Sequence, residues 1–210
     1  MPEFVHLHLH SEYSLLDGAC RIKDIPARAL ECGHTSVAIT DHGCMYGVIA
    51  FYNECKKNGI KPIIGCEVYV ASGSRFERGL NKDASKYNHL VLLCKNEIGY
   101  KNLMYMVSKG YTEGFYSRPR VDMELLRQHS QGLIALSGCL KGDVSACLVS
   151  GNYDLAKKKA LEYEAKIKEK EQTLEKLKEE LSVPVRPIAL DLLREDSFRA
   201  FRELLETEQP

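Results

Sequence analysis

The chain has 210 residues, 44% of them hydrophobic, and is therefore long enough to bury the core of one large domain. Its 29 lysines and arginines balance its 29 aspartates and glutamates, which gives a net charge of zero. This balance excludes a strongly basic nucleic-acid-binding module, and we expect weak intrinsic affinity for DNA. It leaves open an enzyme that holds phosphates through metal ions.

Three histidines alternate near the start of the chain: His6, His8 and His10. In a β-strand, side chains at alternate positions point to the same face. A strand over Phe4–Leu9 would therefore aim the three imidazoles the same way, as in sites for zinc, manganese or iron. Asp17 follows in a glycine-containing turn. The alternative is a terminal tag or a solvated polar face, which the interleaved aliphatic residues disfavour.

Short apolar runs then alternate with helical patterns. Asp24 and Pro26 are typical of a helix start, and Gly33 of a helix end. The predicted strands are Ser36–Thr40, Lys61–Val70, His89–Cys94 and Gly132–Ser137. The other predicted helices are Tyr46–Asn58, Glu97–Ser108 and Asp122–His129. Ser72–Tyr87 is predicted to be a long loop, of a length that is often functional. The alternation predicts an α/β fold with a mainly parallel sheet or barrel.

The last part of the chain has a different character. A long charged helix is predicted over Asn152–Ser182, where apolar residues recur every seventh position at Ala160, Ile167, Leu174 and Leu181. A solvated amphipathic helix is favoured over a true coiled coil, because the repeat is short. A strand within Val183–Asp191 and a helix over Glu195–Glu208 follow.

Potential metal ligands gather at and beyond the predicted strand ends. The carboxyl ends of parallel strands share one rim, so side chains from several strands can meet there. The set comprises His8, His10, Asp17, Asp41, His42 and Glu67. Such a mixture suits two or more divalent metals bridged by Glu67 or Asp17, which would hold a phosphate and activate a water.

Four candidate positions have alternative interpretations. Asp41 could cap the next helix or orient an imidazole through its other nitrogen. Glu67 lies within an apolar strand, where a carboxylate needs a partner, and this favours a functional role. Cys139 alone indicates a buried thiol. His89 begins its strand and is expected at the opposite rim. The two histidines in polar contexts, His34 and His129, are expected at the surface.

The cysteines indicate a reducing compartment. There are eight of them, without a C-x-x-C pair that would predict a zinc ribbon or a thioredoxin motif. No signal peptide is recognisable, and no apolar stretch approaches the roughly 18 residues of a membrane span. We expect a cytoplasmic protein with mostly free thiols and no membrane partner.

Seven stretches resemble, in order, the PHP (polymerase and histidinol phosphatase) domain family, in the branch found in bacterial DNA polymerase III alpha subunits. They are FVHLHLHSEYSLLDG, AITDHG, KPIIGCEVYV, HLVLLCKN, GYKNL, GFYSRPRVD and LSGCL. The resemblance implies a distorted (β/α)7 barrel with up to three metals at one rim. It also implies a role in DNA replication, with DNA and other replicase subunits as partners.

The resemblance assigns roles to particular residues. The implied metal ligands are His8, His10, Asp17, His42, Glu67, His89 and Cys139. Glu67 is the implied bridging carboxylate, and the catalytic carboxylates are Glu67, Asp17 and Asp41. The implied ions are zinc or manganese, with iron or magnesium as alternatives. Members that retain all the ligands resemble metal-dependent 3′–5′ exonucleases that can proofread.

Two departures from the family lower the expected activity. The family ends on an Asp-x-His motif, but no histidine follows His129 in this sequence. The resemblance ends near residue 165, which predicts an incomplete barrel over residues 1–165 and a divergent helix–strand–helix tail over residues 166–210. A non-catalytic replication module and an inert truncated or fused fragment are the alternatives. Polymerase activity is not expected.

Overall fold

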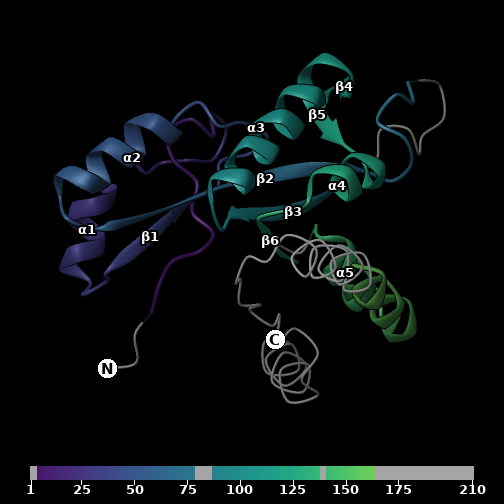
Figure 1. The fold of residues 1–210 in the computed structure, drawn as a ribbon. Helices are drawn as coiled ribbons and strands as arrows, with labels where there is room; N and C mark the ends of the chain where they lie inside the picture. The colour runs from purple at the N-terminus through teal and green to yellow at the C-terminus, as the bar shows by residue number, and fades with distance from the viewer. Residues whose placement is uncertain (1–3, 79–86, 138–140, 164–210) are drawn as a thin grey trace, which may run out of the picture. The chain divides into compact units, whose positions relative to one another are not determined.

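The computed structural model describes residues 4–78, 87–137 and 141–163 (Figure 1). The chain divides into two units, residues 1–170 and 171–210, and all described residues belong to the first. Cys139 and the tail predicted beyond residue 165 lie outside the described residues. Within them, no helix is both long enough and apolar enough to cross a membrane.

A mixed sheet of six strands lies at the centre of the fold (Figure 1). The strands are β1 (Ser36–Ile39), β2 (Lys61–Ala71), β3 (Tyr87–Cys94), β4 (Phe115–Tyr116), β5 (Arg118–Val121) and β6 (Leu133–Leu136). They are ordered β4-β5-β2-β3-β6, and β1 pairs with the first half of β2. The mixed α/β fold is as predicted, whereas β4 and β5 were not predicted.

The prediction of a mainly parallel sheet is wrong. β1 and β5 run parallel to β2, but β3 is antiparallel to β2, and β6 is antiparallel to β3. The physical reason is that side chains alternate along a strand in the same way whichever direction it pairs, so the local pattern does not reveal whether neighbours are parallel or antiparallel.

Helices flank the sheet. They are α1 (Ile25–Glu31), α2 (Val48–Lys57), α3 (Glu97–Thr112), α4 (Met123–His129) and α5 (Asp143–Val149), and residues 153–163 are also helical. As predicted, α1 begins directly after Asp24 and has Pro26 in its first turn. Gly33, which has a φ of +76°, follows the end of the helix. Asp122 caps α4 by accepting a hydrogen bond from the Leu125 amide. Only α5 was not predicted.

Two of the three hydrophobic clusters among the described residues bear on the orientation of β2. Ile39 and Phe51 belong to the cluster beside α1 and α2. Val68, Leu103 and Met106 belong to the cluster beneath α3 and α4. Because side chains alternate along a strand, packing of Val68 into this second cluster turns Glu67 to the opposite face.

The strand predicted over Phe4–Leu9 is wrong. This segment runs beside β1, and the Thr40 amide donates to the Leu9 carbonyl at 2.8 Å, but it is not a strand. The Leu9 amide donates to the Thr40 hydroxyl at 2.9 Å instead of to a carbonyl, which interrupts a regular ladder. As a result His6 does not join His8 and His10. Its ring lies 5.1 Å from that of His34.

Candidate metal centre

Glu67 is the centre of the site. Its side chain is 1% exposed and lies in the middle of β2, whose flanking residues are buried. His10 donates from Nε2 to Glu67 Oε2 at 2.9 Å, and His8 contacts the same oxygen. The other oxygen, Oε1, contacts His89 and lies 3.5 Å from Nδ1 of His42. One buried carboxylate therefore faces four imidazoles, two at each oxygen.

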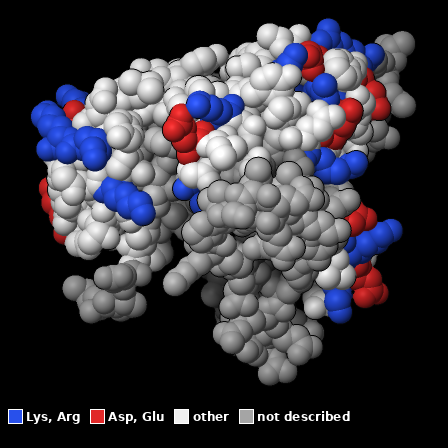
Figure 2. Space-filling model, viewed as in Figure 1, with Lys and Arg blue, Asp and Glu red and all other residues white. Residues whose placement is uncertain are grey.

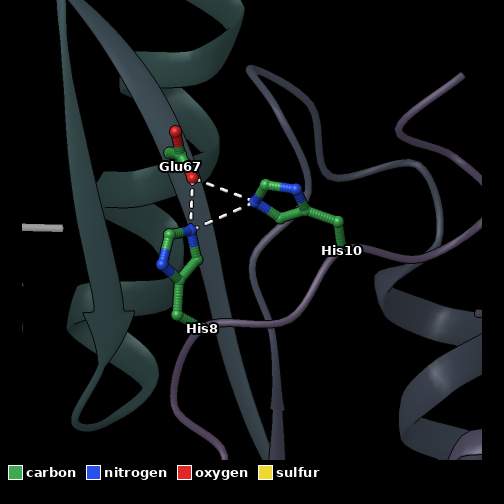
Figure 3. A group of neighbouring side chains, drawn as sticks. All are labelled: His8, His10 and Glu67. Atoms are coloured by element: carbon green, nitrogen blue, oxygen red, sulfur yellow. Dashed lines mark hydrogen bonds and ion pairs between the residues drawn. The ribbon is translucent and has the colours of Figure 1, made fainter. Parts of the chain in front are cut away.

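The geometry around Glu67 Oε2 suits a set of metal ligands. Figure 3 shows His8 and His10 approaching this oxygen, with their Nε2 atoms 3.1 Å apart. If both nitrogens carried protons and donated to this oxygen, the two protons would be crowded together. A cation among the three atoms would instead accept a lone pair from each. Imidazole and carboxylate are donors that suit zinc, iron and manganese.

A second group of donors lies beside the first. His42 contacts Asp17 through Nε2 at 3.0 Å, and Nδ1 of His10 lies 3.9 Å from the same carboxylate oxygen. Asp17 is 56% exposed, so this part of the site is open to solvent. The donor atoms of three overlapping groups each lie within 4.8 Å of one another. These groups are His8–His10–Glu67, His10–Asp17–His42 and His42–Glu67–His89.

The close packing of imidazoles around Glu67 shifts the pKa values of the groups in the site. Burial alone would raise the pKa of Glu67, but hydrogen bonds from His10 and the other imidazoles outweigh it and hold the pKa far below its ordinary value. The hydrogen bond to Glu67 raises the pKa of His10. Burial lowers the pKa of His42, so its imidazole is predominantly neutral at physiological pH. A neutral imidazole is the form that binds metal.

One buried atom supports the fit to metal ions. Nδ1 of His42 makes no hydrogen bond within the described parts of the chain, and it lies 3.5 Å from Oε1 of Glu67. A buried polar atom without such a partner is costly and rare, and a bound ion is one explanation for it. This atom belongs to the group His42–Glu67–His89. The residues present therefore fit a site for more than one divalent metal.

Asp41 has neither of the roles considered from the sequence. Its carboxylate accepts from the Ser11 amide at 2.6 Å, the Ser11 hydroxyl at 2.7 Å and the Ser14 hydroxyl at 2.7 Å. It contacts no imidazole among the described residues, and Gly47 is the N-cap of α2. Asp41 instead fixes the segment that leads to Asp17.

His89 lies at the same rim of the sheet as Glu67, which it contacts. The expectation that it lies at the opposite rim is therefore wrong. The reason is the antiparallel pairing, which brings the start of β3 to the second half of β2 and pairs His89 with Tyr69. The other histidines fall elsewhere. His34 contacts His6, and His129 contacts Asn102 and Tyr105.

Two aromatic residues beside the imidazoles were missed. The ring of Tyr69 stacks on that of His42, with centroids 6.0 Å apart and planes 10° apart. The ring of Tyr87 stacks on that of His89 at 5.9 Å. Tyr69 follows Glu67 by two residues in β2, so strand alternation could have placed it on the same face.

The comparison with protein families matches a PHP domain over residues 6–176. Curated relatives include the DNA polymerase III alpha subunit of Chlamydia trachomatis, 51% identical over 154 residues, and that of Treponema pallidum, 50% identical over 162. These alignments cover 73% and 77% of this chain but 12% and 14% of the relatives. The chain thus spans about an eighth of the length of the curated relatives it matches.

Two solved structures are similar over about half of the chain. One is an amidohydrolase from Chromobacterium violaceum with bound sulfate and no metal, 25% identical with a TM-score of 0.37. The other, from Bifidobacterium adolescentis, is described as a metal-dependent phosphoesterase and is 15% identical with a TM-score of 0.39. The superpositions cover 50% and 52% of this chain, and 32% and 34% of those chains.

Proposed function

The chain belongs to the PHP domain family and is homologous to part of DNA polymerase III alpha subunits, and on this premise we propose that it carries a divalent-metal phosphoesterase site. The proposed reaction is hydrolysis of a phosphodiester at a DNA 3′ end, as in a 3′–5′ exonuclease. The observation that carries this proposal is the convergence of four imidazoles on the two oxygens of buried Glu67.

The potential metal ligands form two sets, one for each of two ions. His8 and His10 with Glu67 Oε2 would hold one, and His42 and His89 with Glu67 Oε1 would hold the other. Bound divalent ions supply polarisation of a phosphoryl oxygen and activation of a water for in-line attack. Zinc or manganese suits this donor set best, with iron or magnesium as alternatives. We also propose Cys139 as a further ligand and Asp17 as one that joins from the loop.

The protein's own groups prepare the site. Glu67 keeps its negative charge at the centre because its pKa is held low. Asp41 acts as a positioning residue, since its three hydrogen bonds fix the loop that carries Asp17. Tyr69, which is 6% exposed, covers one side of the His42 ring and limits the access of water.

The proposal also covers the fold of the whole chain and its partners. We propose that the described sheet belongs to a distorted, incomplete (β/α)7 barrel over residues 1–165, followed by a distinct tail over residues 166–210. DNA and other replicase subunits are the proposed partners, in the cytoplasm. Figure 2 shows lysine, arginine, aspartate and glutamate interspersed over the described part of one face. Such a distribution agrees with weak attraction of DNA by the chain alone.

A second candidate is a non-catalytic module that binds metal for stability and braces a polymerase. It is favoured by the donor groups themselves, because they could hold an ion whether or not a substrate is cleaved there. An inert fragment would go further and bind no metal. Metal content and hydrolysis, measured on the same preparations, separate these three cases.

The experiment compares the parent with Glu67→Gln and with Glu31→Gln, which alters an exposed carboxylate on α1. Metal would be measured by mass spectrometry, and hydrolysis with manganese on p-nitrophenyl phosphate and on labelled single-stranded DNA. We expect bound metal and slow cleavage of the small ester in the parent and in Glu31→Gln, weak or no shortening of DNA, and neither metal nor cleavage in Glu67→Gln. Metal without hydrolysis would favour the second candidate. No metal in the parent would refute both.

A further inference from the structure

Arg118 is placed next to the candidate metal centre by a tight hairpin. β4 and β5 pair through Tyr116 and Arg118, which leaves Ser117 alone in the turn. Ser117 has a φ of +60°, in the left-handed region that favours glycine. Such strain persists where the surrounding structure holds it, and it is concentrated at functional sites. Here it sets the direction of Arg118 at the start of β5.

Two tyrosines connect Arg118 to the imidazoles. The guanidinium carbon of Arg118 lies 5.8 Å from the ring centroid of Tyr69, and the guanidinium donates a hydrogen bond to Tyr87. Tyr69 meets His89 edge-on at 5.2 Å, and Tyr87 stacks on the same imidazole at 5.9 Å. The guanidinium of Arg118 is therefore separated by tyrosine rings from His89, the imidazole that contacts Glu67.

The β4–β5 hairpin packs against the loop that carries His42. A side chain at Gly43 would place its first carbon 2.8 Å from Cε2 of Tyr69 and 3.0 Å from Cγ of Pro119. Gly43 also has a φ of +60°. The close approach of Pro119 thus needs glycine here, and it holds Arg118 at a fixed position beside the site.

Arg118 differs from Arg75 in its partners among the described residues. Arg75 pairs with Asp122 and Glu113, and buried Arg120 donates to backbone carbonyls. No carboxylate of the described residues pairs with Arg118, whose contacts are the two phenols. Its side chain is partly exposed. A guanidinium has five donors in a rigid fork that matches phosphate oxygens, so most of these donors remain for an anion.

We propose that Arg118, held by Tyr87, forms a subsite for a second, non-reacting phosphate of the substrate. Tyr69 stands between Arg118 and the imidazoles, so the guanidinium serves a neighbouring phosphate and not the one that is cleaved. The subsite would bind a strand with successive phosphodiesters, such as a single-stranded nucleic acid. This inference rests on the proposed function, because it names the substrate class of that site.

The test measures binding of labelled oligothymidylate to the full chain by fluorescence anisotropy, with and without manganese, at several salt concentrations. Arg118→Gln should weaken binding about tenfold and reduce the salt dependence by about one phosphate contact. Arg118→Lys should keep the salt dependence but lose part of the affinity, because a point charge replaces the fork. Arg28→Gln, on α1, is the matched control and should bind as the parent does.

The outcomes separate this inference from the proposed function. Metal content is measured on each variant, and Arg118→Gln should retain the metal of the parent. Loss of oligonucleotide binding in Arg118→Gln supports the subsite even where no hydrolysis is detected. Equal affinity and equal salt dependence in the parent and Arg118→Gln would overturn it, as would a parent without saturable binding. A parent without metal refutes the proposed function but leaves the manganese-free comparison decisive for Arg118.

Discussion

Glu67 on β2 and His89 on β3 contact each other across two antiparallel strands, two positions apart in register. Residues in this diagonal relation share one face of a sheet and lie within reach of long side chains. The contact brings a fourth imidazole to Glu67 and adds to the group around its second oxygen. It therefore adds the group His42–Glu67–His89 to the two other groups that could hold a metal ion.

Loss of one imidazole should reduce metal binding selectively. We predict that His8→Ala lowers the metal content of the purified chain, because it removes a donor at Glu67 Oε2. His34→Ala and His129→Ala serve as controls, since both residues lie among other contacts. Mass spectrometry of the three proteins provides the measurement. Equal metal content in all three would exclude His8 as a ligand.

Asp41→Asn should loosen the loop that precedes Asp17. The amide that replaces one carboxylate oxygen is a donor, so it cannot accept all three of the existing hydrogen bonds. We expect a loss of about 1–3 kcal/mol in the free energy of unfolding, measured in urea on metal-free protein. Metal affinity should also fall about 10-fold to 100-fold, as for other residues that position ligands. Asp24→Asn, at an exposed position, is the control.

How far the sequence alone predicted the site depended on the strand directions. The apolar alternation around Glu67 and the motif around His42 were sufficient to predict that these side chains meet. The position of His89 was not, because a local pattern does not reveal whether a strand pairs parallel or antiparallel. The contacts of Asp41 depend on where Ser11 and Ser14 fold, which is a long-range property. The resemblance to the PHP family supplied His89 where the pattern could not.

Metal binding should weaken as the pH falls from 8 to 6. The hydrogen bond to Glu67 raises the pKa of His10 above its ordinary value of 6.5, so protons compete for its Nε2 even above that pH. Because metal requires the neutral imidazole, the apparent affinity is highest above the raised pKa and is lost as the pH falls through it. Competition with a chromophoric chelator measures this. A constant affinity across this range would argue against His10.

Chelation should lower the unfolding temperature. An ion that binds only the folded chain stabilises it by mass action, by about 2.7 kcal/mol at one hundred times the dissociation constant. We predict a drop of several degrees after treatment with a chelator, and recovery on adding zinc or manganese. Glu67→Gln should unfold at one temperature whether or not the chelator is present. A similar shift in this variant would point to a metal bound elsewhere.

The central claim, that Glu67 bridges two ions, is tested most directly by calorimetric titration of metal-free protein with manganese. We predict at least two ions per parent chain, and none bound tightly in Glu67→Gln, because each oxygen of Glu67 serves a different group of imidazoles. His8→Ala should retain one ion, held near His42 and His89. A parent that binds a single ion, or a Glu67→Gln variant that still binds two, would contradict the account.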